Sequence, residues 1–171
     1  ATQVRVEGSV GTLTIAAGAT ITQLNISNTL ATLGAGGAGT TISSLSLGAG
    51  GSITNALATG GNLTIAKIDL SSTAADKSLN LGDMTTAVSN VVGHSTNKLT
   101  LSSTATLSSC AITGGNVDIT GLAATAFNVN ATTSNATVTA AGKNITIGNH
   151  SANTVSIASA ANVSLTGSGA G

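Results

Sequence analysis

Lys143-Asn144-Ile145-Thr146-Ile147 recurs further along the chain as Ala161-Asn162-Val163-Ser164-Leu165. Each copy contains an Asn and then an apolar–polar–apolar triplet. Alternation with a period of two residues is typical of a half-buried β-strand. In such a strand the two aliphatic side chains of the triplet point to one face and the polar side chain points to the other. The pair of copies therefore indicates that short strands recur along the chain.

Similar triplets form two series that cover the whole sequence. The first begins its triplets at Val4, Leu24, Leu45, Leu63, Leu79, Leu99, Val117, Ala136 and Val155, with a mean spacing of about 19 residues. The second, about half a period out of phase, runs through Leu13, Leu30, Ile53, Ile68, Val88, Leu107, Phe127, Ile145 and Val163. Between them lie Gly, Ala, Ser and Asn, which favour turns.

A period of this length with two or three short strands is typical of one coil of a β-solenoid. We expect an all-β fold, a single-stranded parallel β-solenoid (β-helix) of about nine coils of about 19 residues, with no substantial α-helix. Coils stacked at about 4.8 Å would give a rod on the order of 40 Å long. Residues 1–171 should form one domain. A hairpin sandwich is the structural alternative, but the Asn-Gly and Asp-Gly turns that hairpins favour do not occur.

The composition fits a narrow core of uniform width. Hydrophobic residues make up 41% of the chain, Phe127 is the only aromatic, and 6% of residues are charged, with a net charge of +0. The five Lys and Arg residues are dispersed, which argues against binding of nucleic acid or of an anionic membrane surface. No apolar run approaches the roughly 18 residues that a bilayer requires, so we expect no membrane insertion.

These coils, with aliphatic triplets and Gly/Asn/Ser/Thr turns, resemble the passenger β-helices of bacterial filamentous haemagglutinins and autotransporter adhesins. The resemblance covers nearly the whole chain and carries no diagnostic functional residue. It implies a rod that is secreted and either extracellular or displayed at the cell surface. The chain departs from that pattern in having so little charge and so few aromatic residues.

Two glycine-rich stretches match ligand-binding motifs formally. Residues 34–39 read Gly-Ala-Gly-Gly-Ala-Gly, but strand-like residues follow and no acidic residue appears until Asp69, so a turn is expected in place of a dinucleotide site. Residues 114–118 end in Asp118 and are similar to a calcium-binding repeat. The equivalent positions in the neighbouring coils are Thr100 and Thr137, so stacked carboxylates are absent. We therefore expect no cofactor and no metal.

The ionisable residues do not form an evident catalytic group, and we expect no catalytic residue and no enzyme activity. Asp69 and Asp118 fall in different series. The interpretation of the remaining candidates is structural: a local ion pair on a loop for Asp76, Lys77 and Asp83, exposed turn positions for His94 and His150, and a buried thiol for Cys110.

Threonine pairs keep an ice-binding solenoid open as the alternative function. They occur at Thr12/Thr14, Thr20/Thr22, Thr104/Thr106 and Thr137/Thr139. Ice-binding solenoids display regular Thr ranks on a flat face. The outward positions of the first series are instead mixed, reading Arg5, Asn25, Ser46, Thr64, Asn80, Thr100, Asp118, Thr137 and Ser156.

The two ends of the repeat suggest how the rod functions. Solenoids usually cover their ends with a helix, a charged coil or aromatic residues, and the sequence predicts none of these at either end. Two explanations fit: the chain is a segment of a longer rod, or its ends, marked by Val4, Val6, Val163 and Leu165, are assembly surfaces, which is the interpretation we favour. The expected partner is a second copy of the chain, arranged head to tail in an extracellular filament or surface fibre. Adhesion to a cell or host surface is the nearest variant.

Overall fold

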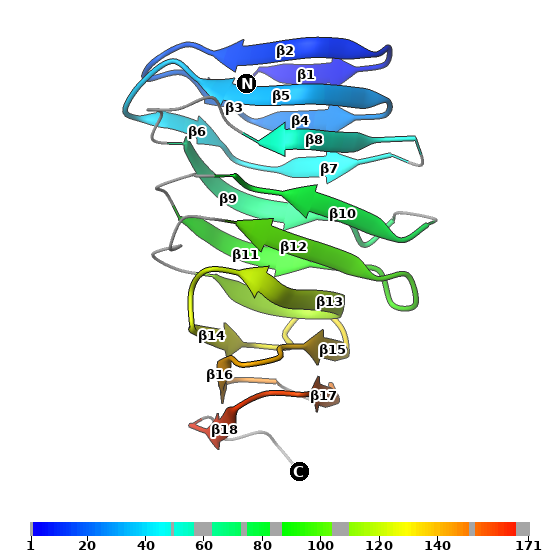
Figure 1. Cartoon of the computed structure of the whole chain (residues 1–171), viewed down its shortest axis with the longest axis vertical. Coiled ribbons are helices and arrows are strands. Elements are labelled where there is room, and N and C mark those ends of the chain that lie inside the picture. Colours follow the sequence, from blue (N-terminus) through cyan, green and yellow to red (C-terminus); the bar gives the residue numbers. More distant parts are fainter. Residues whose placement is uncertain are drawn as a thin grey trace.

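The chain is a parallel β-solenoid (Figure 1). The computed structural model describes residues 2–48, 50–56, 63–72, 75–82, 87–103, 110–150 and 153–166. Its strands lie across the long axis, and the first and last strands lie at opposite ends of the rod. No helix occurs among the described residues. In the part of the chain described, nothing helical is therefore long and apolar enough to cross a membrane.

One side of the solenoid, here called sheet A, is a parallel ladder that runs from the first strand to the last. It contains β1 (Gln3–Val6), β3 (Thr20–Ile21), β4 (Gln23–Ile26), β6 (Thr40–Ile42), β7 (Leu45–Leu47), β9 (Leu63–Asp69), β11 (Val88–Val92), β14 (Ala126–Val129), β16 (Asn144–Ile147) and β18 (Asn162–Leu165). Residues 111–114 of β13 (Ala111–Leu122) also belong to it.

The opposite side, sheet B, is a second parallel ladder. It contains β2 (Val10–Ile15), β5 (Thr29–Ala35), β8 (Ser52–Ala56), β10 (Lys77–Asn80), β12 (Leu99–Ser103), β15 (Ala136–Thr139) and β17 (Val155–Ala158). Residues 115–122 of β13 complete it, so this long strand bends from one sheet into the other. Each coil thus contributes to both sheets, and the core lies between them.

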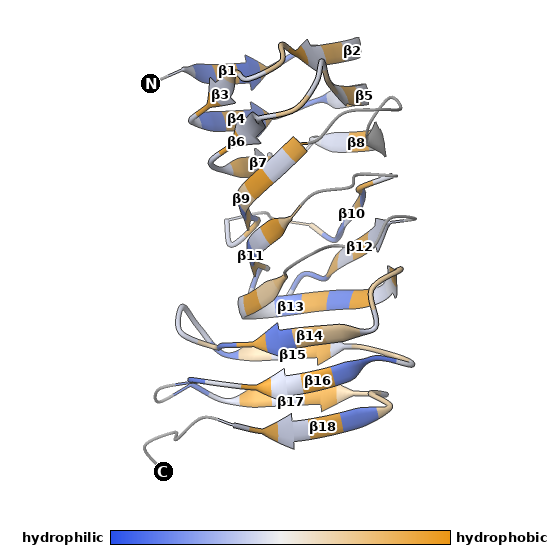
Figure 2. Cartoon of the chain, turned by 90° about the vertical axis from the view of Figure 1, so that its left-hand side faces the viewer, coloured by the Kyte–Doolittle hydropathy of each residue, from blue (hydrophilic) through white to orange (hydrophobic). Residues whose placement is uncertain are grey.

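A single column of aliphatic side chains runs down the whole of sheet A in register. Its members are Val4, Leu24, Leu45, Ile68, Val91, Ile112, Val129, Ile147 and Leu165. The seven members from Leu24 to Ile147 are all buried. Hydrophobic and hydrophilic residues alternate along the strands in Figure 2, as an inward and an outward face require. Burying each such side chain contributes about 1.5–3 kcal/mol.

The predicted fold class is confirmed, but the number of coils is corrected. The nine triplets of the first series lie on sheet A up to Leu63 in β9 and on sheet B from Leu79 in β10 onward. The interval from Leu63 to Leu79 is a half-turn across the core and not a short coil. The series therefore counts about seven turns rather than nine.

Coil length varies along the rod, measured between residues in register. The coil is shortest between Ile112 and Val129 and longest between Ile53 and Leu79. The aliphatic column of sheet A stays in register through these differences, so the core is continuous; two of the length changes are register shifts inside β13, opposite β11 and β12. The predicted outward row is accordingly divided between two faces: Arg5, Asn25, Ser46 and Thr64 lie on sheet A, and Asn80, Thr100, Asp118, Thr137 and Ser156 lie on sheet B.

Side chains at the corners replace backbone hydrogen bonds that the turns interrupt. Thr40 Oγ1 donates to the Gly37 carbonyl at 2.8 Å and lies 3.3 Å from that of Ala16, one coil earlier. Lys143 is buried, and its ammonium donates to the Leu122 carbonyl of the preceding coil. Asn153 likewise donates to the Ala131 carbonyl at 2.6 Å. Buried backbone acceptors are thereby satisfied where no strand passes.

Candidate assembly surface

The last described coil exposes an apolar strand. In β18, Val163 is 50% exposed and Leu165 is 68% exposed. Their partners in β16, Ile145 and Ile147, are 1% and 8% exposed because β18 covers them. Val163 and Leu165 therefore lack the aliphatic contacts that equivalent side chains of the interior coils make with the coil beyond them.

The backbone at this end is also available for pairing. β18 pairs with β16 on one side and has no strand on its other side among the described residues. The same holds for β17 in sheet B, where Val155 and Ile157 are half-buried. An unpaired strand edge is a template for another strand. Asn162 Nδ2 donates to Asn144 Oδ1 at 2.8 Å, which forms an amide pair between β18 and β16 on the outer face.

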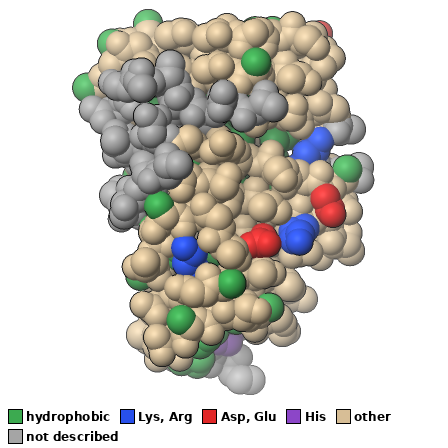
Figure 3. All heavy atoms as spheres, in the orientation of Figure 1, with side chains coloured by type: hydrophobic (Ala, Val, Ile, Leu, Met, Phe, Trp, Pro, Cys, Tyr) green, Lys and Arg blue, Asp and Glu red, His purple; other side chains and the backbone are tan. Residues whose placement is uncertain are grey.

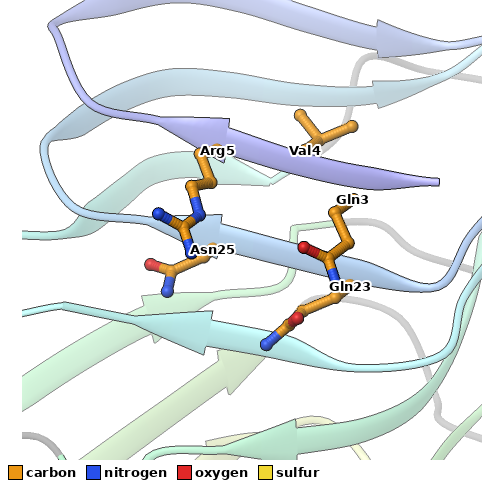
Figure 4. A pocket seen from close by; sticks show the side chains of 5 residues that line it. All are labelled: Gln3, Val4, Arg5, Gln23 and Asn25. Atoms are coloured by element: carbon orange, nitrogen blue, oxygen red, sulfur yellow. The ribbon is translucent and has the colours of Figure 1, made fainter.

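At the opposite end the first coil is better covered. Val6 is 5% exposed, Val4 is half-buried, and Val10 in β2 is 36% exposed. On the outer face of β1, Gln3 lies beside Gln23 and Arg5 lies beside Asn25, as Figure 4 shows. The crevice between them has a volume of about 20 Å³, which holds no more than a water molecule.

The four residues predicted to mark the assembly ends lie on two separate surfaces. Val4 and Val6 are in β1, and Val163 and Leu165 are in β18, at opposite ends of the rod (Figure 1). Within one chain they do not meet. In the register of sheet A, however, Val4 and Leu165 are the first and last members of the same aliphatic column.

Charge is concentrated between the ends. Figure 3 shows basic and acidic side chains interspersed over the middle coils, with no single-sign patch on the face in view. Lys67 pairs with Asp69 at 2.6 Å, and Lys98 lies 4.0 Å from Asp118. Burial by itself raises the pKa of Asp69, but hydrogen bonds from Lys67 and from the Ser71 hydroxyl and N–H outweigh it and hold the pKa below its usual range. Described residues 153–166 contain no charged side chain.

The glycine-rich motifs are structural where they are described. Residues 36–39 connect β5 to β6, which is a strand, so the dinucleotide motif lacks the helix it would need. Asp118 lies on sheet B between Thr100, as expected, and Thr139, because the expected neighbour Thr137 is in register with Asn116 instead. Asp118 accepts a hydrogen bond from the Thr120 N–H at 3.0 Å. Over the described ranges, no three His, Cys, Asp or Glu side chains are grouped to hold a metal ion.

Of the charged residues expected on a loop, Lys77 lies instead in β10, and Asp76 directly precedes that strand. Lys77 Nζ donates to the Gly51 carbonyl at 3.1 Å, Asp76 Oδ1 accepts from the Lys98 N–H at 2.7 Å, and Asp83 lies outside the described residues.

Cys110 is 7% exposed, which confirms the predicted buried thiol. Burial raises the pKa of the Cys110 thiol to about 12.

His94 has a role that the sequence did not reveal. It lies in a turn as expected but is half-buried and not exposed, and its Nδ1 accepts hydrogen bonds from the N–H groups of Thr96 and Asn97 at 3.2 and 3.1 Å. The imidazole thereby closes the turn between β11 and β12. His150, also half-buried, accepts through its backbone carbonyl from the Asn153 N–H. The sequence pattern His-x-Thr is too common to have predicted the hydrogen bonds that the His94 ring accepts in this turn.

A groove on sheet B was also missed. It lies between β8 and β10, has a volume of about 420 Å³, and is lined by Gly50, Gly51, Ser52, Ile53, Asp76, Lys77, Ser78, Asn80 and Ser102. The sequence signal that marks its position is the interval from Leu63 to Leu79, the shortest in the first triplet series.

No protein-family model, curated protein or solved structure matches this chain. The likeness to filamentous haemagglutinins and autotransporter passengers therefore rests on the solenoid pattern, and the structure supports it at the level of a parallel β-helix.

Proposed function

We propose that this chain is a structural rod that assembles end to end, with β18 of one copy seated against β1 of the next. The observation that carries the proposal is the exposure of Leu165. Every member of its column from Leu24 to Ile147 is buried by the following coil, whereas Leu165 is 68% exposed. A further coil supplied by a second copy would bury it and Val163 together.

The two end strands are complementary in pattern. β18 reads Asn-Val-Ser-Leu and β1 reads Gln-Val-Arg-Val, both with alternating polar and apolar residues in sheet A. A parallel register that places Val163 beside Val4 and Leu165 beside Val6 keeps apolar side chains on the core face. It also places Asn162 beside Gln3, which would join the Asn144–Asn162 pair to the Gln3–Gln23 pair in one amide ladder.

Electrostatics does not oppose this contact. Described residues 153–166 carry no charge, and the first coil carries Arg5 and Glu7. Like charges therefore do not face one another across the junction. A head-to-tail contact of this kind is heterologous and does not close, so it propagates into a filament.

The junction has one geometric consequence. β18 lies half a coil beyond β17, and β1 lies half a coil before β2, so both ends are led by a sheet A strand. A copy seated on β18 therefore leaves one strand position in sheet B, between its own β2 and the β17 of its neighbour. The stack is continuous along sheet A and interrupted once per subunit along sheet B.

A location outside the cell or at its surface completes the proposal. The chain contains one cysteine, little charge, and a surface of Thr, Ser, Asn and Gly. In a displayed rod, such a repetitive surface would have an architectural role. Adhesion to a cell or host surface is a variant of that role. The head-to-tail contact is the part that can be tested directly.

Negative-stain electron microscopy of the purified chain across a concentration series tests the assembly. We expect filaments as wide as one solenoid, lost in Leu165→Glu, which places a carboxylate inside the junction. Asn128→Glu is the matched control, because Asn128 is exposed on β14 in the middle of sheet A. Monodisperse short rods at high concentration, or filaments that persist in Leu165→Glu, would overturn the proposal.

A second candidate function, ice binding, is favoured by one specific rank of threonines. Thr20, Thr41 and Thr64 are in register on three successive coils of sheet A and point outward. Thermal hysteresis of the purified chain tests it. Hysteresis that disappears in Thr41→Asp and persists in Thr137→Asp, on sheet B, would support ice binding by this rank. A wild-type chain without hysteresis would exclude this function.

A further inference from the structure

The groove on sheet B arises from a break in the ladder between two strands. β8 and β10 are in register at one pair, Ile53 with Leu79, whereas β10 and β12 are in register over four residues. The coil between Ile53 and Leu79 is the longest of those measured by register. The strand edges diverge on either side of the single pair, which leaves the open space of about 420 Å³. This volume lies within the range of small-molecule sites, about 300–1,000 Å³.

Three polar side chains of the groove are held in place by the backbone. Lys77 Nζ donates to the Gly51 carbonyl at 3.1 Å, and Asp76 Oδ1 accepts from the Lys98 N–H at 2.7 Å. Asn80 Oδ1 accepts from the Gly82 N–H at 2.8 Å. Fixing these side chains before binding reduces the entropy that a ligand must remove.

Further hydrogen-bonding capacity faces the groove. The hydroxyls of Ser52, Ser78 and Ser102 and the amide nitrogen of Asn80 make no hydrogen bond to a described residue. Asp76 keeps its second carboxylate oxygen without a described partner. The groove therefore offers hydroxyl and amide donors together with hydroxyl and carboxylate acceptors.

The balance of these groups selects the class of ligand. One carboxylate and one ammonium offset each other, so the groove does not favour an anion or a cation. None of its lining residues is aromatic, so it offers no platform on which a planar base or ring could stack. Ligands with many hydroxyls and no charge match a dense array of mixed donors and acceptors.

We propose that the groove between β8 and β10 binds a neutral saccharide, one or two sugar units long. Hydroxyl groups of the sugar donate to Asp76 and accept from Asn80, and the three serines bond to the remaining hydroxyls. The absence of an aromatic face keeps the interaction weak, with a dissociation constant on the order of 1 mM. This site is independent of the ends of the rod and does not require assembly.

Saturation-transfer difference NMR tests the proposal, because it detects weak binding to single rods and to filaments alike. The probes are cellobiose, lactose, maltose and N,N′-diacetylchitobiose, with glucuronic acid as an anionic comparison. We expect saturation transfer to at least one of the four neutral disaccharides. Ser52→Ala, Ser78→Ala and Ser102→Ala combined should weaken it roughly tenfold or more, since three hydrogen bonds are lost. These hydroxyls bond to no described residue, so the fold should persist.

The matched control combines Thr22→Ala, Thr137→Ala and Ser156→Ala, three outward positions away from the groove. It should leave binding unchanged. Circular dichroism of both triple variants verifies the fold. No transfer to any neutral disaccharide, equal transfer in both triple variants, or a response confined to glucuronic acid would each overturn the proposal.

Discussion

Leu165 occupies the position directly beyond Ile147 in the register of sheet A, yet Leu165 is 68% exposed and Ile147 is 8% exposed. The two side chains are equivalent in the repeat, and among the described residues a strand lies beyond Ile147 but none lies beyond Leu165. Burial in a solenoid is thus conferred by the next coil and not by the strand's own sequence. Ile147 is therefore expected to contribute to the stability of the single rod, whereas Leu165 is expected to contribute to assembly.

The first prediction uses this pair in dilute, unassembled protein. Ile147→Ala should lower the free energy of unfolding by about 2–5 kcal/mol, because it leaves a cavity beneath β18. Leu165→Ala should change it by less than about 0.5 kcal/mol, because little of that side chain is buried. Urea unfolding followed by circular dichroism measures both. Equal losses would mean that Leu165 is already covered in the single rod.

The second prediction concerns three glycines that differ in backbone and surroundings. Gly115 has a φ of +80°, and a Cβ there would collide with the Gly93 carbonyl of the preceding coil. Gly142 has a φ of +72° but no heavy atom within 4 Å of a Cβ, and Gly8 has neither constraint. Gly142→Ala should therefore cost about 1–2 kcal/mol of stability, and Gly8→Ala close to none.

Gly115→Ala should cost clearly more than Gly142→Ala, because it adds a backbone collision to the same dihedral strain. Thermal unfolding of the three variants in parallel gives the order. If Gly115→Ala and Gly142→Ala are equally destabilised, coils at this corner can separate without cost, and the close contact with Gly93 is unimportant.

The third prediction follows from the buried thiol. Burial raises the pKa of Cys110 to about 12, compared with an ordinary value of 9.0. The folded state therefore retains a proton that the unfolded state loses above pH 9, and this contribution to stability declines as pH rises from about 9 to 12. Cys110→Ala should remove that part of the pH dependence. Unfolding at a series of pH values, with Cys110→Ala as the reference, measures the difference.

The same burial predicts low reactivity, since the thiolate is the nucleophile. Under native conditions at pH 8, reaction of Cys110 with an aromatic disulfide reagent should be far slower than in urea. Rapid reaction of the native chain would show that this thiol is accessible.

The fourth prediction concerns the turn between β11 and β12. His94→Asn should keep much of the stability, because an Asn carbonyl oxygen accepts from the same N–H groups in an Asx-turn. His94→Leu should lower the free energy of unfolding by about 1–3 kcal/mol, since it removes the acceptor for the N–H groups of Thr96 and Asn97. Equal stability of the two variants would contradict a capping role for the imidazole.

The strands themselves were predictable because their signal is local. Val163-Ser164-Leu165 and Ile145-Thr146-Ile147 alternate with a period of two, and the structure places each in a strand with its neighbour in register. The matching positions of Asn144 and Asn162 in the two copies are also in register in the structure, and their side chains are joined by a hydrogen bond of 2.8 Å. The burial of Cys110 followed from its aliphatic surroundings.

The turn count was not predictable from the same pattern. Leu63 and Leu79 begin similar triplets, but one lies on sheet A and the other on sheet B. A triplet states which of its side chains point inward and does not state which side of the core its strand covers. The short interval from Leu63 to Leu79 marked an irregularity in the repeat, but it identified neither the longest coil, from Ile53 to Leu79, nor the groove that this coil opens.

The candidate end residues show the same division. The sequence placed Val4 and Leu165 in similar triplets, and the register between strands was needed to show that they begin and end one column. His94 and Asn80 carried no sequence signal, because their roles depend on backbone groups that a turn brings to them.

By itself, the sequence determined that this protein is a parallel β-solenoid with an aliphatic core, because alternation and turn residues are properties of neighbouring positions. The tertiary structure alone decided which sheet each strand joins, where the ladder opens into a groove, and which equivalent side chains remain exposed. Those features depend on contacts between successive coils, whose partners are far apart in the chain and whose separation differs from coil to coil. The alternation of a strand is set by its neighbouring residues, whereas its partner in the next coil is set by the length of chain between them.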